Sequence, residues 1–173
     1  MVLRAKICIL GEQGVGKTSL ILKYVKDYFP IEYKASLGAD FLQKTITSDE
    51  VPELEGKNME LIIWDIAGQK SYELNKMTDY YLQGSNGFIL VYDRTNKKSL
   101  KDLDSWYKKI SKICGDIPFI IVGNKSDLAD QIEATEKDLR SYQRKWKAPS
   151  FYSSAKTGKN VDKIFHQLVR LIL

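Results

Sequence analysis

The sequence contains little of what a disulfide framework or a zinc site requires. Its 173 residues include two cysteines, Cys8 and Cys114, and a single histidine. Two well-separated thiols without a CxxC pair are typical of a protein from a reducing compartment. We therefore expect a cytoplasmic protein, with a peripheral position on the cytosolic face of a membrane as a further option.

Long apolar runs are also missing. No stretch of about 18 or more apolar residues is present, which argues against a membrane-spanning helix. The N-terminal MVLRAKICIL is too short, and too soon followed by glycines, for a secretory signal. Pro/Gly/Ser-rich linkers and repeats are absent, and the length suits a single folded unit, so we expect one domain over residues 1–173.

Blocks of like charge are absent as well. The net charge is +5, but segments such as KKSLKDLDSWYKKISK mix both signs. Nucleic-acid-binding proteins more often gather Lys and Arg on one face or in a tail, so we expect no nucleic-acid partner. A composition that is 43% hydrophobic and 28% charged is ordinary for a globular protein.

The apolar pattern predicts an α/β fold. Four nearly continuous β-branched runs, KICILG, ELIIWD, GFILVYD and PFIIVGN, are typical of strands buried on both faces of a parallel sheet, and SFYSSA is a weaker fifth. DFLQKTIT alternates, which predicts an edge strand that pairs with MELIIWD as an antiparallel hairpin. Helical spacing between the strands predicts an open sheet covered by helices on both faces. The expected helices span 17–26, 72–82, 97–113, 134–147 and 161–173.

A phosphate-binding loop follows the first apolar run. GEQGVGKTS matches G-x-x-x-x-G-K-[ST] at Gly11, Gly16, Lys17 and Thr18. Its glycines let backbone N–H groups surround phosphates, Lys17 reaches the β- and γ-oxygens, and the Thr18 hydroxyl binds Mg²⁺. Kinases, ATPases and GTPases share this loop, so it predicts a phosphate ligand without naming the base.

The segment VGNKSDL favours guanine as the base. Asp127, just beyond a strand, can accept hydrogen bonds from N1–H and the 2-amino group of guanine, whereas adenine offers neither donor. In the later SSAK, the Ala155 N–H can meet the guanine O6, and the stems of Lys125 and Lys156 can pack along the base.

A third motif, WDIAGQK, supplies the expected hydrolytic centre. Asp65 ends a strand, where it can hold Mg²⁺ through a water, and Gly68 lets its N–H approach a γ-phosphate. Gln69 follows directly and can orient the attacking water, so we expect it to be the catalytic residue.

These motifs, Gly11–Ser19, Asp65–Gln69, Asn124–Asp127 and Ser154–Lys156, resemble those of the Ras superfamily of small GTPases over essentially the whole chain. The segments EYKASLGADF, LIIWDIAGQ and GFILVYDRT are similar to the Rab branch. The resemblance implies a three-layer P-loop NTPase fold with a six-stranded, mostly parallel sheet and five helices. It also implies a molecular switch that hydrolyses GTP to GDP slowly unless an activating protein assists.

The resemblance assigns further roles. It places Ser36 on Mg²⁺ and the γ-phosphate, and Phe29 over the guanine, while Phe41, Trp64 and Tyr80 resemble the aromatic trio through which Rab proteins contact effectors. We expect a monomer that meets effectors, an exchange factor and an activating protein through its switch regions. The expected metal ligands are Thr18, Ser36 and Asp65. The expected nucleotide-binding residues are Gly11, Gln13, Gly14, Val15, Gly16, Lys17, Thr18, Ser19, Phe29, Ser36, Gly68, Asn124, Lys125, Asp127, Leu128, Ser154, Ala155 and Lys156.

Several features depart from the family pattern. Ser36 replaces the usual threonine and lacks its β-branch, so we expect a less ordered first switch. Gln13 and Lys70 replace a glycine and an acidic residue, and the hairpin tip TSDEVPELEGKNME is longer than in relatives. We expect this tip to be a solvated acidic loop, with a partner site as the alternative. The C-terminal LVRLIL carries no prenylation motif, so we expect membrane attachment only if the full-length protein continues into a lipidated tail.

Two other functions remain open on the sequence. A scaffold that holds GTP or GDP with little hydrolysis would use the same binding motifs, and an ATP-dependent small-molecule kinase would use the same phosphate loop. Intact Gln69, Ser36 and Asp65 favour the hydrolysing switch over the scaffold. Asp127 and the lack of an arginine-rich lid oppose the kinase.

Overall fold

The computed structural model describes residues 2–32, 34–68 and 72–173. The expected catalytic residue Gln69 and its neighbour Lys70 lie outside these ranges. In chain order the elements are β1 (Val2–Leu10), α1 (Lys17–Lys26), β2 (Ala39–Ile46), the 3₁₀ helix η1 (Pro52–Leu54), β3 (Asn58–Ile66), α2 (Tyr72–Leu82), β4 (Gly87–Asp93), α3 (Lys97–Cys114), β5 (Phe119–Asn124), η2 (Ala129–Gln131), α4 (Glu136–Trp146), β6 (Ser150–Tyr152) and α5 (Val161–Ile172).

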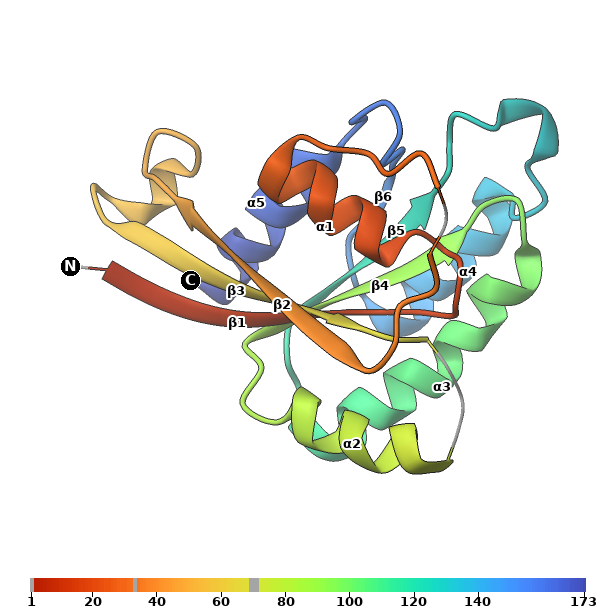
Figure 1. Cartoon of the computed structure of the whole chain (residues 1–173), viewed down its shortest axis with the longest axis horizontal. Coiled ribbons are helices and arrows are strands. Elements are labelled where there is room, and N and C mark those ends of the chain that lie inside the picture. The colour runs from red at the N-terminus through yellow and green to blue at the C-terminus, as the bar shows by residue number, and fades with distance from the viewer. Residues whose placement is uncertain (1, 33, 69–71) are drawn as a thin grey trace.

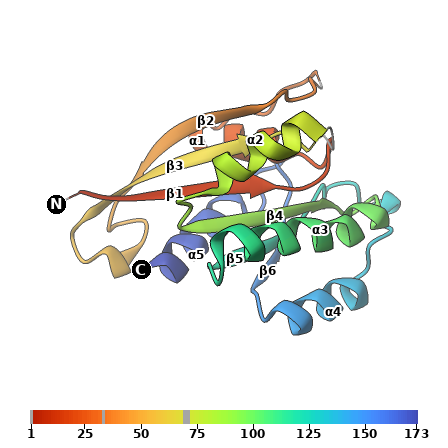
Figure 2. The same cartoon turned by 90° about the horizontal axis from the view of Figure 1, so that it is seen from below.

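The strands form one six-stranded sheet with the order β2-β3-β1-β4-β5-β6. Strands β2 and β3 pair antiparallel over eight residue pairs, and the other neighbours are parallel. The predicted α/β class, edge strand, hairpin and five helices are confirmed. Figures 1 and 2 show α1 and α5 on one face of the sheet and α2, α3 and α4 on the other.

The central strands are buried because helices cover both faces. All seven residues of β4 are buried. In β1, Ile7 and Ile9 belong to the cluster with α1 and α5, whereas Cys8 and Leu10 belong to the cluster with α3 and α4. Continuous rather than alternating apolar runs are the expected sequence of such strands. No helix within the described ranges is long and apolar enough to cross a membrane.

The hairpin tip differs from the expected solvated loop. Its acidic side chains are exposed, but Val51 and Leu54 are buried in the cluster beneath α1 and α5. Glu53 also pairs with Arg170 of α5 at 2.9 Å between Oε1 and Nε. The tip is therefore docked on the C-terminal helix through two apolar side chains and an ion pair.

His166 of α5 is largely covered and lies beside this tip. Its side chain is 17% exposed, its ring lies edge-on to Tyr24, and its Nε2 is 3.9 Å from Glu50 Oε1. Burial lowers the pKa of His166, partly offset by Glu50 and Asp162.

Candidate functional site

A cavity of about 860 Å³ lies beyond the carboxyl ends of the parallel strands. Ligands bind at this edge in open α/β sheets because the connecting loops meet there. The walls include the following residues expected from the sequence: Gln13, Gly14, Gly16, Lys17, Thr18, Ser19, Phe29, Ser36, Gly68, Asn124, Lys125, Asp127, Leu128, Ala155 and Lys156. The expected residues Gly11, Val15, Asp65 and Ser154 do not line it. The wall residues that sequence reasoning missed are Leu22, Tyr28, Pro30, Ile31, Glu32 and Lys34.

The loop between β1 and α1 has a backbone that requires glycine. Gly14 and Gly16 have φ values of 79° and 99°, in the region that L side chains rarely adopt. A Cβ on Gly16 would also collide with the side-chain amide of Asn124. The loop is thereby packed against the end of β5, and its backbone N–H groups lie at the start of α1.

Lys17 is folded back over this loop. Its Nζ donates to the carbonyl oxygens of Gly11 at 2.9 Å and Glu12 at 2.8 Å, and the residue is 6% exposed. Burial lowers the pKa of Lys17 to about 8, although Asp65 and Glu12 act in the opposite direction. A buried ammonium group whose hydrogen bonds to the loop go to neutral carbonyls is well suited to an anionic ligand.

Thr18, Ser36 and Asp65 meet at the same end of the cavity. The Thr18 hydroxyl donates to Asp65 Oδ2 and lies 2.7 Å from the Ser36 hydroxyl. Asp65 is 9% exposed, and its Oδ1 is buried without a hydrogen-bond partner. Burial raises the pKa of Asp65, with the Thr18 hydrogen bond and the Lys17 charge opposing it. Two hydroxyls and an under-satisfied carboxylate are hard oxygen ligands, which fit Mg²⁺.

Gly68 brings the end of the β3 region against the phosphate loop. A Cβ at this position would overlap the backbone of Gly11, Glu12 and Gln13. Only glycine allows this approach. The two loops are therefore in contact within the described part of the chain.

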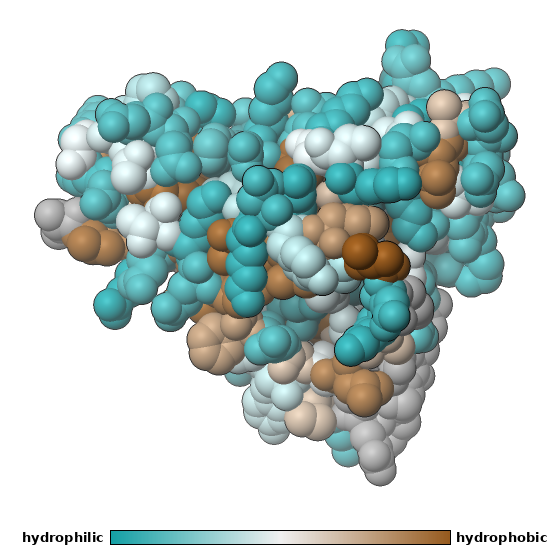
Figure 3. Space-filling model, turned by 45° about the horizontal axis from the view of Figure 1, so that its top comes forward, coloured by the Kyte–Doolittle hydropathy of each residue, from teal (hydrophilic) through white to brown (hydrophobic). Residues whose placement is uncertain are grey.

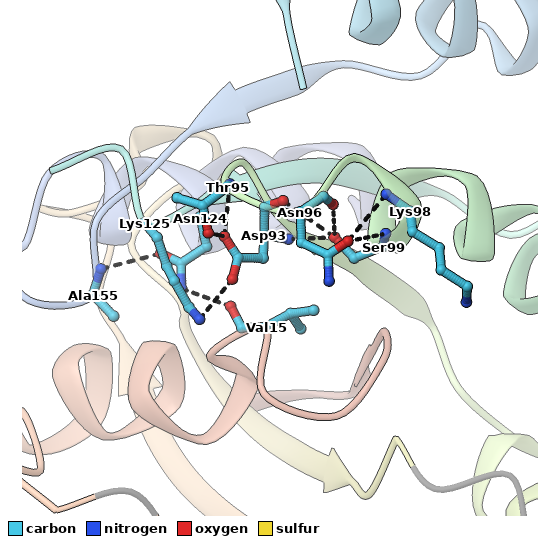
Figure 4. A network of polar contacts seen from close by, with 9 residues as sticks. All are labelled: Val15, Asp93, Thr95, Asn96, Lys98, Ser99, Asn124, Lys125 and Ala155. Atoms are coloured by element: carbon cyan, nitrogen blue, oxygen red, sulfur yellow. Dashed lines mark hydrogen bonds and ion pairs between the residues drawn. The ribbon is translucent and has the colours of Figure 1, made fainter. Parts of the chain in front are cut away.

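The other end of the cavity is built around Asn124. This residue is 2% exposed, and its Nδ2 donates to the Val15 carbonyl at 3.0 Å. Its Oδ1 accepts from Ser153 Oγ at 3.1 Å and from the Ala155 N–H at 3.2 Å. Asn124 thereby joins the phosphate loop, the end of β5 and the loop after β6, as Figure 4 shows for Val15 and Ala155.

Asp127 and Ser154 form a second link at this end. Ser154 Oγ donates to Asp127 Oδ1 at 2.6 Å and accepts from the Thr157 N–H at 3.1 Å. Ser154 itself is 1% exposed. It therefore supports the Asp127 carboxylate from behind the wall, which explains why it does not line the cavity.

The aromatic residues Phe41 and Trp64 lie side by side on β2 and β3. Their ring centroids are 5.5 Å apart, and Trp64 is equally far from Tyr81. Tyr80, the third residue expected from the sequence, is 74% exposed, and Phe41 is 52% exposed. Tyr81, whose ring is tilted against that of Trp64, was not predicted as part of this group. On the face turned to the viewer in Figure 3, hydrophilic side chains dominate and apolar surface forms separate patches.

Comparison with known proteins identifies this arrangement. The family model described as "Ras family" matches residues 6–173. The chain belongs to the Ras family. Among its relatives are the Ras-related protein Rab-21 of Geodia cydonium, 37% identical over 98% of this chain and 71% of the relative, and Rab-18 of Lymnaea stagnalis, 38% identical over 97% and 80%. SEC4 of Saccharomyces cerevisiae is 36% identical over 96% of this chain and 74% of its own.

Membership of the Ras family gives the general activity. Ras-family proteins are GTP-binding switches that hydrolyse GTP to GDP, and this chain is one of them. The Rab names of the relatives agree with the Rab-like switch segments in the sequence.

Proposed function

We propose that the cavity of about 860 Å³ holds GTP or GDP with Mg²⁺, and that the protein is a Rab-type switch acting in membrane traffic. One observation carries this proposal. Residues from the phosphate loop line a single cavity together with residues from the NKSD and SSAK segments, both of which come more than 100 positions later in the chain.

At the phosphate end, Lys17 exchanges its bonds to the Gly11 and Glu12 carbonyls for bonds to phosphate oxygens. The ammonium group then gains charged partners in a buried site. The N–H groups at the start of α1 add further donors and the positive end of the helix dipole. Gln13 and Ser19 also line the cavity.

Thr18, Ser36 and Asp65 are the residues that would hold Mg²⁺, Asp65 through a water. The ion, when bound, neutralises negative charge on the phosphates. The hydrogen bond between Thr18 and Asp65 orients both side chains. Ser36 comes from the segment before β2. Ser36 therefore makes its contact only when that segment lies over the cavity, which gives the first switch its dependence on the γ-phosphate.

At the base end, Asp127 selects guanine by accepting hydrogen bonds from N1–H and the 2-amino group. Adenine would not supply these two donors, at a cost of about 1–3 kcal/mol per lost bond. The Ala155 N–H exchanges its 3.2 Å bond to Asn124 Oδ1 for the guanine O6. The Lys125 and Lys156 stems and Leu128 line the base, and Phe29 covers it.

Gln69 orients the water that attacks the γ-phosphate. No arginine lines the cavity in the described ranges, so we propose that hydrolysis is slow until an activating protein contributes one. Effectors, exchange factor and activating protein bind over the switch regions, with Phe41, Trp64 and Tyr80 as effector contacts. We further propose a monomeric, single-domain protein in the cytoplasm, attached to a membrane only through a lipidated extension.

The test follows bound nucleotide by chromatography after the protein is loaded with GTP and Mg²⁺. Ras alone hydrolyses on the order of 10⁻⁴ GTP per second, so samples are taken over hours. Slow conversion to GDP that is nearly abolished in Gln69→Leu supports the proposal. Gln83→Leu, an exposed glutamine after α2, is the matched control and is expected to behave like the wild type.

Two results would contradict the proposal in different ways. GTP that persists unchanged in the wild type would indicate a guanine-nucleotide scaffold. Failure of the wild type to retain guanine nucleotide would show that the cavity is not the binding site.

A further inference from the structure

Asp93 ends β4 just outside the cavity and has no role in the function described above. It is 8% exposed, and strand pairing places it directly beside Asn124. One carboxylate oxygen, Oδ1, accepts from the Thr95 N–H at 2.8 Å and from Thr95 Oγ1 at 2.7 Å. The other, Oδ2, is 2.7 Å from Lys125 Nζ. Both oxygens are therefore held, and the carboxylate has one orientation.

Lys125, the partner of Asp93, has an unusual backbone. Its φ of 65° lies in the left-handed region, where a side chain other than glycine is disfavoured. Its side chain lines the cavity, and 32% of it is exposed. A long side chain at such a position loses rotamer freedom when a ligand orders it, unless it is already held. The ion pair with Asp93 supplies that hold (Figure 4).

A chain of hydrogen bonds connects Asp93 to the start of α3. Ser99 Oγ accepts from the Asp93 N–H at 2.9 Å and donates to the Asn96 carbonyl at 2.7 Å. Asn96 is the N-cap of α3, and its side chain accepts from the N–H groups of Lys98 and Ser99. Asp93 is therefore anchored to the start of α3 (Figure 4), a long helix on the opposite face of the sheet from the phosphate-loop helix α1 (Figure 1).

We propose that Asp93 is a positioning residue for the guanine nucleotide. By holding the Lys125 ammonium group, it keeps the Lys125 stem against the base end of the cavity before nucleotide arrives. The nucleotide then meets a preorganised wall and leaves slowly. Asp93 does not line the cavity, so it acts through Lys125 and not by direct contact. This inference rests on the proposed location of the nucleotide in the cavity.

The test measures the release of fluorescently labelled GDP after a chase with excess unlabelled GDP. Asp93→Asn keeps an oxygen for Thr95 and removes the charge that Lys125 meets. We expect release to accelerate about tenfold, the factor that corresponds to ~1.4 kcal/mol. Asp104→Asn is the matched control, because Asp104 pairs with Lys145 at 2.6 Å away from the cavity walls, and its release rate stays that of the wild type.

A double variant separates positioning from a purely structural role. If Asp93 acts through Lys125, Asp93→Asn accelerates release in the wild type but not in a Lys125→Met background. An equal acceleration in both backgrounds, or an unchanged rate in Asp93→Asn, would overturn the proposal. Should Asp93→Asn not fold, Lys125→Arg replaces it. If Lys125→Arg releases GDP more slowly than Lys125→Met, the ion pair with Asp93 is supported. If the two variants release GDP at the same rate, the ion pair has no such role.

Retention of labelled GDP by the wild-type protein distinguishes a failure of this inference from a failure of the proposed function on which it depends. A wild-type protein that does not retain labelled GDP contradicts the proposed site itself. A wild-type protein that retains GDP, with a rate unaffected by Asp93→Asn, contradicts the role of Asp93 alone.

Discussion

Thr18 and Asp65 are hydrogen-bonded across the phosphate end of the cavity, although 47 positions separate them in the chain. The bond satisfies one carboxylate oxygen, and the other is buried and unpartnered. An isolated buried oxygen of this kind costs free energy until a donor or a cation reaches it. A cation at the phosphate end, in addition to the Lys17 ammonium group, would therefore stabilise this Asp65 oxygen.

Asp65→Asn should remove the effect of Mg²⁺ on nucleotide release. In the wild type, chelation of Mg²⁺ by EDTA is expected to accelerate GDP release about tenfold or more, since ~1.4 kcal/mol corresponds to a factor of ten. In the variant, release should already be fast and should change little on chelation. Asp49→Asn, at an exposed position in the hairpin tip, is the control. A variant that still responds fully to EDTA would show that Asp65 does not support the ion.

Asn124→Ala should weaken nucleotide retention strongly. The substitution removes the links to Val15, Ser153 and Ala155 and leaves buried polar groups without partners, at about 1–3 kcal/mol each. We expect the GDP release rate to rise by about a hundredfold, which corresponds to ~3 kcal/mol. The control is Asn86→Ala, which removes a 2.8 Å bond to the Lys6 N–H far from the cavity walls. Similar release rates in both variants would contradict this role.

Phe165→Ala should destabilise the fold through its stack with Tyr24. The two rings are 3.9 Å apart at an interplanar angle of 1°, and Phe165 is 1% exposed. Truncation of a buried phenylalanine lowers the free energy of unfolding by about 3–5 kcal/mol. Denaturant unfolding measures this loss. Leu171→Ala, in the same helix but 40% exposed, should change it by less than about 0.5–1 kcal/mol. Equal losses would argue against the packed stack.

Asp138 should account for part of the acid sensitivity of the protein. The Lys97 ammonium group, first, and hydrogen bonds from Thr135 lower the pKa of Asp138 from 3.8 to about 2. A carboxyl whose pKa is depressed in the fold stabilises the protein above its unfolded pKa, and this contribution is lost as the pH falls from about 4 to about 2. Asp138 also completes the capping box of α4.

Asp138→Asn should therefore lower the free energy of unfolding by about 1 kcal/mol at pH 7, the usual value of a helix cap. The difference from the wild type should shrink as the pH approaches 2. Denaturant unfolding at a series of pH values measures both quantities. Asp116→Asn removes a carboxylate from an exposed turn and serves as the charge-matched control. A difference that stays constant down to pH 2 would mean that the charge of Asp138 contributes nothing.

Much of the fold could be predicted because its strands are buried on both faces. Runs such as GFILVYD have no solvent-facing side, and only a covered parallel sheet accommodates them. The same topology explains why the motifs could be placed together. Each follows a strand or opens a helix at the same edge of the sheet, so the spacing of Lys17 and Asn124 in the sequence does not matter.

The features that could not be predicted depend on tertiary contacts, which leave no periodic pattern in the local sequence. The unpredicted wall residues Tyr28, Pro30, Ile31, Glu32 and Lys34 come from a segment with neither helical nor strand periodicity. Val51 and Leu54 are isolated apolar residues in an acidic stretch, and their burial is decided by the space beneath α5. The covered position of His166 follows from that docking. Asp93 was visible as the end of a strand, but its partner Lys125 directly follows β5, the neighbouring strand in the sheet.

The docked hairpin tip has a consequence for how the molecule can change shape. Strands β2 and β3 are paired from Ala39 with Ile66 to Ile46 with Met59, and beyond this ladder Val51 and Leu54 are fixed in the core. A slip by one residue would turn every side chain of β2 to the other face of the sheet and withdraw both anchors. The pairing register is thus locked at its far end, and a rearrangement of the first switch that depends on the nucleotide must be taken up by the backbone before Ala39.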